Sequence, residues 1–202
     1  MTKPTVPAAG TTRPAEDLLD AAERLLIREG HAAISTRRVA EEAGLNHGLV
    51  HYYFGSIDEL LVQVLERFTQ RLIERQREMY ALDVPFIEKW RTAMIYLDAD
   101  EASGYQKLWL ELQALSWNRP ELRERVASVN AMWREVVTEA FTVASRDYGI
   151  EADTFPVPAI VSLVMTFNQG LILEGLCGVR EGRDELLDAI DRWLMSLEGG
   201  SA

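Results

Sequence analysis

Two histidines four residues apart, His47 and His51, are the first feature of the sequence that could do chemistry. In a helix, side chains at this spacing lie one turn apart on the same face, where two imidazoles can hold a zinc ion. A zinc site also needs a third and a fourth ligand, and no carboxylate stands between the two histidines as it does in His-Glu-x-x-His. The remaining histidine, His31, lies in a predicted loop before the helix at residues 36–43. We therefore predict no metal at this pair.

A helix whose polar rings touch another molecule is the alternative, and the next residues favour it. Tyr52, Tyr53 and Phe54 follow His51 directly, so hydrogen-bonding rings gather on one short segment. The elements that carry and support this segment decide what it can bind.

Composition and charge limit the class of protein. The chain has 202 residues, of which 48% are hydrophobic, which is enough for one large or two small globular domains. The net charge is −11, yet residues 1–55 hold 6 basic and 7 acidic residues, so the acidity belongs to the remainder. A near-neutral N-terminal part can still bind DNA through a small local surface. The single cysteine and the lack of an apolar leader predict a reducing, cytoplasmic location with no membrane partner.

Apolar residues recur at helical spacing throughout the chain, and no segment alternates as a strand does. We therefore predict an all-α protein of about nine helices. Ser35 and Asn46 are suited to cap two short helices, and Ser56 with Glu59 forms a capping box for a long one. The expected helices span residues 14–29, 36–43, 47–54, 56–81, 85–99, 103–117, 120–148, 157–176 and 184–197.

The long helix sets the domain organisation that we expect. Its roughly 25 residues span ~37 Å, long enough to join two domains. Before it, the Pro- and Thr-rich residues 1–13 are expected to form a flexible arm, and residues 14–56 a small three-helix domain. Residues 57–198 then form a larger helical domain.

The helices at 36–43 and 47–54, joined by Gly44-Leu45-Asn46, have the dimensions of a helix-turn-helix, whose second helix enters the DNA major groove. Val50 and Phe54 mark the core side of that second helix. Its other faces carry imidazole, phenol and small apolar groups that can reach bases and phosphates, and the first turn of the preceding helix adds phosphate donors. The residues expected to contact DNA are Thr36, Arg37, His47, Gly48, Leu49, His51, Tyr52 and Tyr53.

The segment "ISTRRVAEEAGLNHGLVHYYFGSIDELL" resembles the DNA-binding segment of the tetracycline-repressor (TetR) family of bacterial one-component regulators. The resemblance covers about residues 14–65, and beyond them it is one of architecture only. It implies a homodimer that binds a near-palindromic double-stranded operator and releases it when a small molecule occupies the second domain. Two positions depart from the family pattern. Leu49 replaces a common small hydroxyl residue, and Ile57 replaces a common phosphate-binding lysine.

All five tryptophans lie in the second domain, between residues 90 and 193. Core packing explains each one taken singly, but Trp and Met clustered with a few polar groups also suit a pocket for a small hydrophobic or aromatic effector. Asn168 and Gln169 in an otherwise apolar helix need hydrogen-bond partners, which a ligand, water or a second subunit can supply. The expected ligand-binding residues are Trp90, Met94, Trp109, Gln113, Trp133, Val137, Phe167 and Asn168.

The last two helices are unusually apolar. Residues 157–176 are apolar nearly all round, but Asn168, Gln169 and Glu174 interrupt them, which favours a helix buried on several sides over a membrane span. We predict a four-helix dimer interface from these two helices, with packing inside one chain as the alternative. We expect Cys177 to be buried. The interface residues expected on the last helix are Leu186, Leu187, Ile190, Trp193 and Leu194.

These features together predict a dimeric, ligand-responsive repressor with no metal and no cofactor. An enzyme is disfavoured because every histidine lies in or beside the helix-turn-helix, so no Ser/His/Asp or Cys/His set can form elsewhere. A second class stays open: a helical small-molecule carrier or interaction protein with a degenerate helix-turn-helix, which the weak positive charge and the changes at Leu49 and Ile57 would suit.

Overall fold

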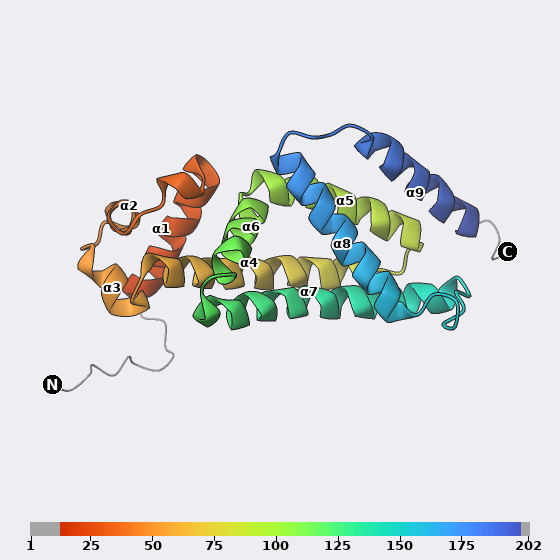
Figure 1. Ribbon diagram of the computed structural model, residues 1–202, viewed down its shortest axis with the longest axis horizontal. Coiled ribbons are helices and arrows are strands. Elements are labelled where there is room, and N and C mark those ends of the chain that lie inside the picture. Colours follow the sequence, from red (N-terminus) through yellow and green to blue (C-terminus); the bar gives the residue numbers. More distant parts are fainter. Residues whose placement is uncertain (1–12, 199–202) are drawn as a thin grey trace.

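Helices are the only regular elements among residues 13–198, the part of the chain that the computed structural model describes (Figure 1). This confirms the predicted all-α fold. The predicted arm lies outside the described residues except for Arg13, where the first helix begins. A short 3₁₀ turn, η1, covers His31–Ala33. The α-helices are α1 (Arg13–Glu29), α2 (Thr36–Ala43), α3 (Gly48–Phe54), α4 (Ile57–Tyr80), α5 (Phe86–Ala102), α6 (Tyr105–Ser116), α7 (Pro120–Asp147), α8 (Val157–Leu176) and α9 (Arg183–Glu198).

Side-chain caps start the helices of the N-terminal unit where the sequence predicts. Ser35 Oγ accepts a hydrogen bond from the Arg38 N–H at 3.3 Å, and Ser56 Oγ accepts one from the Glu59 N–H at 3.1 Å. Gly44 ends α2 in the left-handed conformation, with φ of 67°, which few other residues adopt at low cost. These caps fix the lengths of α2 and α4 and hence the place of α3 between them.

One continuous core joins the two predicted domains. Leu18 and Leu25 of α1, Val50 of α3 and Leu65 of α4 are fully buried in the same cluster as Leu108 of α6. α4 runs from the small unit along the second one, beside α7 (Figure 1). A shift of α4 is therefore felt on both sides of the predicted boundary at residue 56.

Ion pairs clamp the first turns of α4 to α7. Arg125 of α7 pairs with Glu59 and with Glu66, and its Nη2 lies 2.5 Å from Glu66 Oε2. Arg119, just before α7, pairs with Asp58. These contacts hold the start of α4, immediately after α3, against the second unit.

The last two helices cover the second unit from different sides. α8 packs on α7, while α9 packs on α5 rather than on α8 (Figure 1). Among the described helices, α8 alone has the length and composition to cross a membrane, and only a minority of its residues is buried in this one chain. Cys177, expected to be buried, is exposed because it follows the last residue of α8, where the chain turns away.

Candidate DNA-binding surface and ligand cavity

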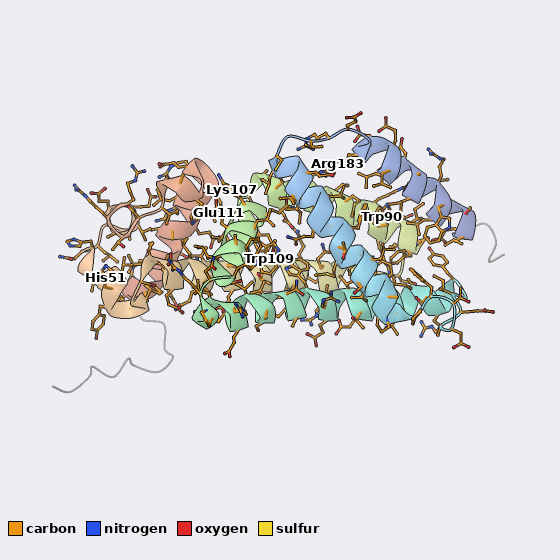
Figure 2. All side chains as sticks on the ribbon, in the orientation of Figure 1. His51, Trp90, Lys107, Trp109, Glu111 and Arg183 are labelled. Atoms are coloured by element: carbon orange, nitrogen blue, oxygen red, sulfur yellow. The ribbon has the colours of Figure 1, made fainter. Side chains whose placement is uncertain are left out.

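The predicted reading helix, α3, is built on an asparagine turn. Asn46 Oδ1 accepts a hydrogen bond from the Gly48 N–H at 2.8 Å, which starts the helix one residue later than predicted. Val50 and Phe54 are buried against α1 and α4, as the helical wheel indicates. The opposite face, which includes His51, is therefore turned outward at one end of the molecule (Figure 2).

The side chains of α3 differ in how far they project. His47, His51 and Tyr52 are exposed, and Tyr52 keeps 65% of its surface accessible. Leu49 and Tyr53 are half-buried and pack against the core, so only part of each side chain is accessible to DNA. The accessible face is thus narrower than predicted and centres on the two imidazoles and one phenol.

Hydrogen bonding orients the second imidazole. His51 Nδ1 lies 3.1 Å from the carbonyl oxygen of Gly55, the residue that ends α3. In a neutral ring whose Nδ1–H donates to this carbonyl, Nε2 is a hydrogen-bond acceptor, which suits an amino group on a base edge. Tyr52 is held beside it by an edge-to-face contact with the ring of Tyr53, with centroids 4.9 Å apart.

The start of α2 contributes the two remaining predicted contacts. Arg37 is exposed and its Nε lies 2.8 Å from Glu41 Oε1, one turn further along the same helix. This hydrogen bond raises the pKa of the Arg37 guanidinium. A surface pair of this kind contributes little, so a DNA phosphate can take the place of Glu41. Thr36 is half-buried at the first turn of α2.

Chelation should leave the molecule unchanged. Among the described residues no three of the types His, Cys, Asp or Glu lie together as metal ligands, so His47 and His51 have no third partner. We expect 5 mM EDTA to shift neither the thermal unfolding midpoint nor DNA affinity, measured by circular dichroism and fluorescence anisotropy. A loss of either on chelation, with recovery on adding Zn²⁺, would restore the metal interpretation.

A cavity of about 110 Å³ lies in the second unit, among residues of α4, α5, α6, α7 and α8. Six of the eight predicted ligand-binding residues line it. They are Trp90, Met94, Trp109, Trp133, Val137 and Asn168. Gln113 and Phe167 do not line the cavity, but each contacts a residue that does. Gln169 Nε2 donates to Gln113 Oε1 at 3.1 Å, and the Phe167 ring lies 6.1 Å from that of Trp90.

Sequence reasoning missed the polar residues of this cavity, chiefly Gln76, Asp100 and Tyr105. The Tyr105 hydroxyl accepts a hydrogen bond from Trp133 Nε1 at 2.7 Å, and burial raises the pKa of Tyr105 to about 12. The sequence could have indicated Gln76, because this polar residue lies one turn beyond Leu72 on the apolar stripe of α4. Asp100 was not, because its burial depends on how α5 meets α4.

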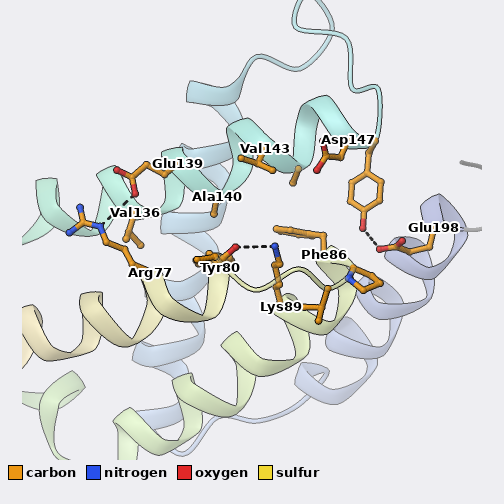
Figure 3. Close-up of a pocket in the computed structure, with 15 residues that line it drawn as sticks. Arg77, Tyr80, Phe86, Lys89, Val136, Glu139, Ala140, Val143, Asp147 and Glu198 are labelled. Atoms are coloured by element: carbon orange, nitrogen blue, oxygen red, sulfur yellow. Dashed lines mark hydrogen bonds and ion pairs between the residues drawn. The ribbon is translucent and has the colours of Figure 1, made fainter.

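A second, larger hollow of about 440 Å³ lies next to the first, where α4 ends and α5 begins (Figure 3). Its charged groups are largely paired. Lys89 Nζ donates to the Tyr80 carbonyl at 2.9 Å, and Arg77 lies 3.5 Å from Glu139. None of the predicted ligand-binding residues lines it. We place the ligand in the smaller cavity, because that one gathers the predicted residues.

α6 connects the smaller cavity to the N-terminal unit. Tyr105 and Trp109 of α6 line the cavity. Two residues after Trp109, Glu111 reaches the N-terminal unit, where its Oε2 lies 2.6 Å from His31 Nδ1 in η1. Lys107 and Glu111 lie on the side of α6 that faces α1 (Figure 2). The cavity thus has two routes to the DNA-binding surface, one through α6 and one through α4.

Comparison with known proteins places the N-terminal unit in the family that its sequence resembles. Residues 18–64 match the family described as bacterial regulatory proteins, tetR family. An uncharacterized HTH-type transcriptional regulator of Haemophilus influenzae is 32% identical over 77 residues, which are 38% of this chain and 41% of that protein. The HTH-type transcriptional regulator PksA of Bacillus subtilis is 22% identical over 111 residues, 53% of each chain. The chain thus spans about half or less of these relatives.

The likeness in fold extends further than the likeness in sequence. The crystal structure of a putative TetR-family transcriptional regulator from Rhodococcus sp. matches 89% of this chain and 98% of its own, with a TM-score of 0.66 and 24% identity. The arrangement of the second unit is therefore shared even where its residues are not.

Proposed function

The chain belongs to the tetR family of bacterial regulatory proteins, and from this premise we propose a homodimeric repressor that leaves its operator when a small apolar effector fills the central cavity. The family is one of transcriptional regulators. This confirms the family that the sequence predicts and the prediction that the chain is not an enzyme. Operator, effector, dimer and a cytoplasmic location are the further parts of the proposal.

The observation that carries the proposal is the outward face of α3. It presents His47, His51 and Tyr52 to solvent, and α3 contains no acidic residue to repel phosphate. The net charge of −11 gives little general attraction to DNA, so affinity has to come from this surface and from Arg37. Binding is then specific rather than general.

The proposed partner surface lies mainly on α8. Leu163 and Leu173 are 57% and 53% exposed, and Thr166 and Gly170 stand between them at helical spacing on the same exposed stripe. A solvent-exposed apolar stripe of this length is typical of a helix that packs against a second subunit. The two-fold axis of a dimer would place this stripe against its own copy.

On α9, the structure divides the predicted interface residues into two groups. Leu186 and Trp193 are exposed and belong to the proposed interface. Leu187 and Ile190 are half-buried, and Leu194 is 5% exposed because it packs inside its own chain. We therefore leave Leu194 out of the surface offered to a partner.

Control follows from the place of α4. Gln76 and Tyr80, near the end of α4, line the cavity, whereas the start of α4 follows α3 directly. A ligand that favours one tilt of α4 changes the separation of the two reading heads in a dimer. Only its preference between the two tilts counts, and we expect a coupling of about 1–3 kcal/mol.

Replacing Tyr52 by alanine tests the reading surface. We expect the loss of about 1–3 kcal/mol of binding free energy on the operator and much less on shuffled DNA, because a base contact is lost. Fluorescence anisotropy with both duplexes measures the two affinities. Tyr96→Phe, on α5 outside the cavity lining, is the control and should bind both duplexes as the wild type does. Equal losses on both duplexes for Tyr52→Ala would remove base reading and favour the carrier alternative.

A further inference from the structure

The polar groups that line the central cavity are unevenly used. Several of its N–H donors already have acceptors within the protein. These hydrogen bonds run from Trp133 Nε1 to Tyr105 Oη (2.7 Å), from Gln106 Nε2 to the Leu97 carbonyl (2.7 Å), from Gln169 Nε2 to Gln113 Oε1 (3.1 Å) and from Trp109 Nε1 to Gln169 Oε1 (3.4 Å). A ligand in the cavity finds few donors left to bind.

Two buried acceptors in the same lining have no partner. They are Gln76 Oε1, on a residue that is 8% exposed, and Asn168 Oδ1 on the opposite helix, α8. A buried polar atom without a hydrogen bond lowers stability, and such atoms are rare in folded proteins. Rotating either amide would exchange its oxygen for its NH₂ group, so the amides show that a polar ligand atom belongs here but leave its charge open.

The charge follows from Asp100. This residue is 6% exposed and is the sole charged residue among the described residues that line the cavity. Arg75 donates to both of its carboxylate oxygens from Nη2, at 2.9 and 2.8 Å, but stands outside the lining, with its guanidinium over the Tyr96 ring. Each carboxylate oxygen keeps further lone pairs. Burial raises the pKa of Asp100, although Arg75 lowers it by hydrogen bonding and by its charge, and a second positive charge in the cavity would oppose the effect of burial further.

The walls of the cavity favour the same sign of charge. Seven aromatic rings line it, and the face of an aromatic ring attracts a cation. They belong to Tyr80, Phe86, Trp90, Tyr105, Trp109, Trp133 and Phe141. A carboxylate, in contrast, would meet Asp100 and no basic side chain of the lining. The volume of about 110 Å³ limits a ligand to about one ring unless the helices part.

We propose that the central cavity selects a lipophilic amine: a protonated nitrogen bound by Asp100, Gln76 and Asn168, with an apolar or aromatic body among the rings. This inference rests on the proposed function, since it names the chemical class of the effector. A hydrogen bond from the amine to Gln76 would also connect the effector directly to α4. Because Gln76 belongs to α4, which follows the DNA-reading helix α3, binding of the amine can favour one position of α4 over another.

Three probes of nearly equal shape test the sign of the charge. Phenethylamine is a cation at pH 7, 2-phenylethanol is neutral, and phenylacetate is an anion. Quenching of tryptophan fluorescence and calorimetry give the dissociation constant of each with the full-length protein. We expect the amine to bind at least tenfold more tightly than the alcohol, and the anion to bind most weakly. Equal or tighter binding of phenylacetate would overturn the proposal.

Variants assign the preference to the cavity. Asp100→Asn should reduce the ratio of amine to alcohol affinity at least fivefold, and Asn168→Leu should weaken the amine without reversing the order. Glu78→Gln, an exposed carboxylate on α4 outside the lining, is the matched loss of one charge and should change nothing. An unchanged ratio in Asp100→Asn would contradict the assignment. If that variant unfolds, the wild-type probe series and Asn168→Leu still decide.

DNA binding separates this inference from the function on which it rests. If the amine binds as expected but leaves operator affinity unchanged, the ligand class holds and the switch fails. If phenylacetate or the alcohol releases the operator while the amine does not, the switch holds and the ligand class is wrong.

Discussion

Replacing Leu163 and Leu173 with aspartate should leave a folded monomer that no longer holds an operator. Both side chains project from α8 and are more than half exposed in one chain, so neither change opens the core. In a dimer, each aspartate would be buried without a partner, which costs several kcal/mol per group. A monomer binds one half-site and loses the gain from joining two, so operator affinity should fall at least about a hundredfold, or about 2.8 kcal/mol.

Sedimentation equilibrium measures the oligomeric state, and anisotropy measures operator affinity. Leu82→Asp is the matched control, because Leu82 is 55% exposed but follows the end of α4 and belongs to neither α8 nor α9. It should stay dimeric and bind DNA as the wild type does. A dimer that survives both changes on α8 would move the interface to another surface. Monomers that keep full operator affinity would separate dimerisation from DNA binding.

The second large effect is expected at Arg125. Replacing it by glutamate puts a third carboxylate beside Glu59 and Glu66, where Arg125 now pairs with both. Burial raises the pKa of Glu66 and lowers that of Arg125, so the pair is partly shielded from water. We expect the free energy of unfolding to fall by about 2–4 kcal/mol, between the values for surface and buried pairs.

Urea unfolding followed by circular dichroism measures this change. Arg146→Glu is the control, because Arg146 pairs with Asp147 on the surface and should cost less than about 1 kcal/mol. Arg125→Lys keeps the charge but loses the two-pronged geometry, and should lie between the two. If Arg125→Glu is as stable as Arg146→Glu, the clamp between α7 and α4 contributes nothing.

The helices were largely predictable because their ends are local. Ser35, Gly44 and Ser56 cap or end helices through contacts within four residues, and such contacts are visible in the sequence. η1 was missed because three residues are too short to show a period. The outward face of α3 was predicted in outline, but Leu49 and Tyr53 are half-buried, since both pack against the core that α3 shares with α1 and α4.

Less could be predicted where the burial of a residue depends on which helices become neighbours. The sequence shows that the last helix is apolar along one side, and that side was expected to meet a second subunit. In the structure the side with Leu194 covers α5, which leaves Leu186 and Trp193 exposed. The cavity shows the same limit. Its tryptophans follow from their clustering, but Asp100 is buried only because α5 crosses α4 near Arg75.

The most direct test of the central claim is a comparison of two duplexes. One carries the DNA upstream of the gene for this protein, and the other has the same composition in shuffled order. Anisotropy titrations at 150 mM salt should show the wild type binding the upstream duplex at least about a thousandfold more tightly. Equal affinities for the two duplexes would contradict sequence-specific regulation and leave a helical small-molecule carrier as the function of this fold.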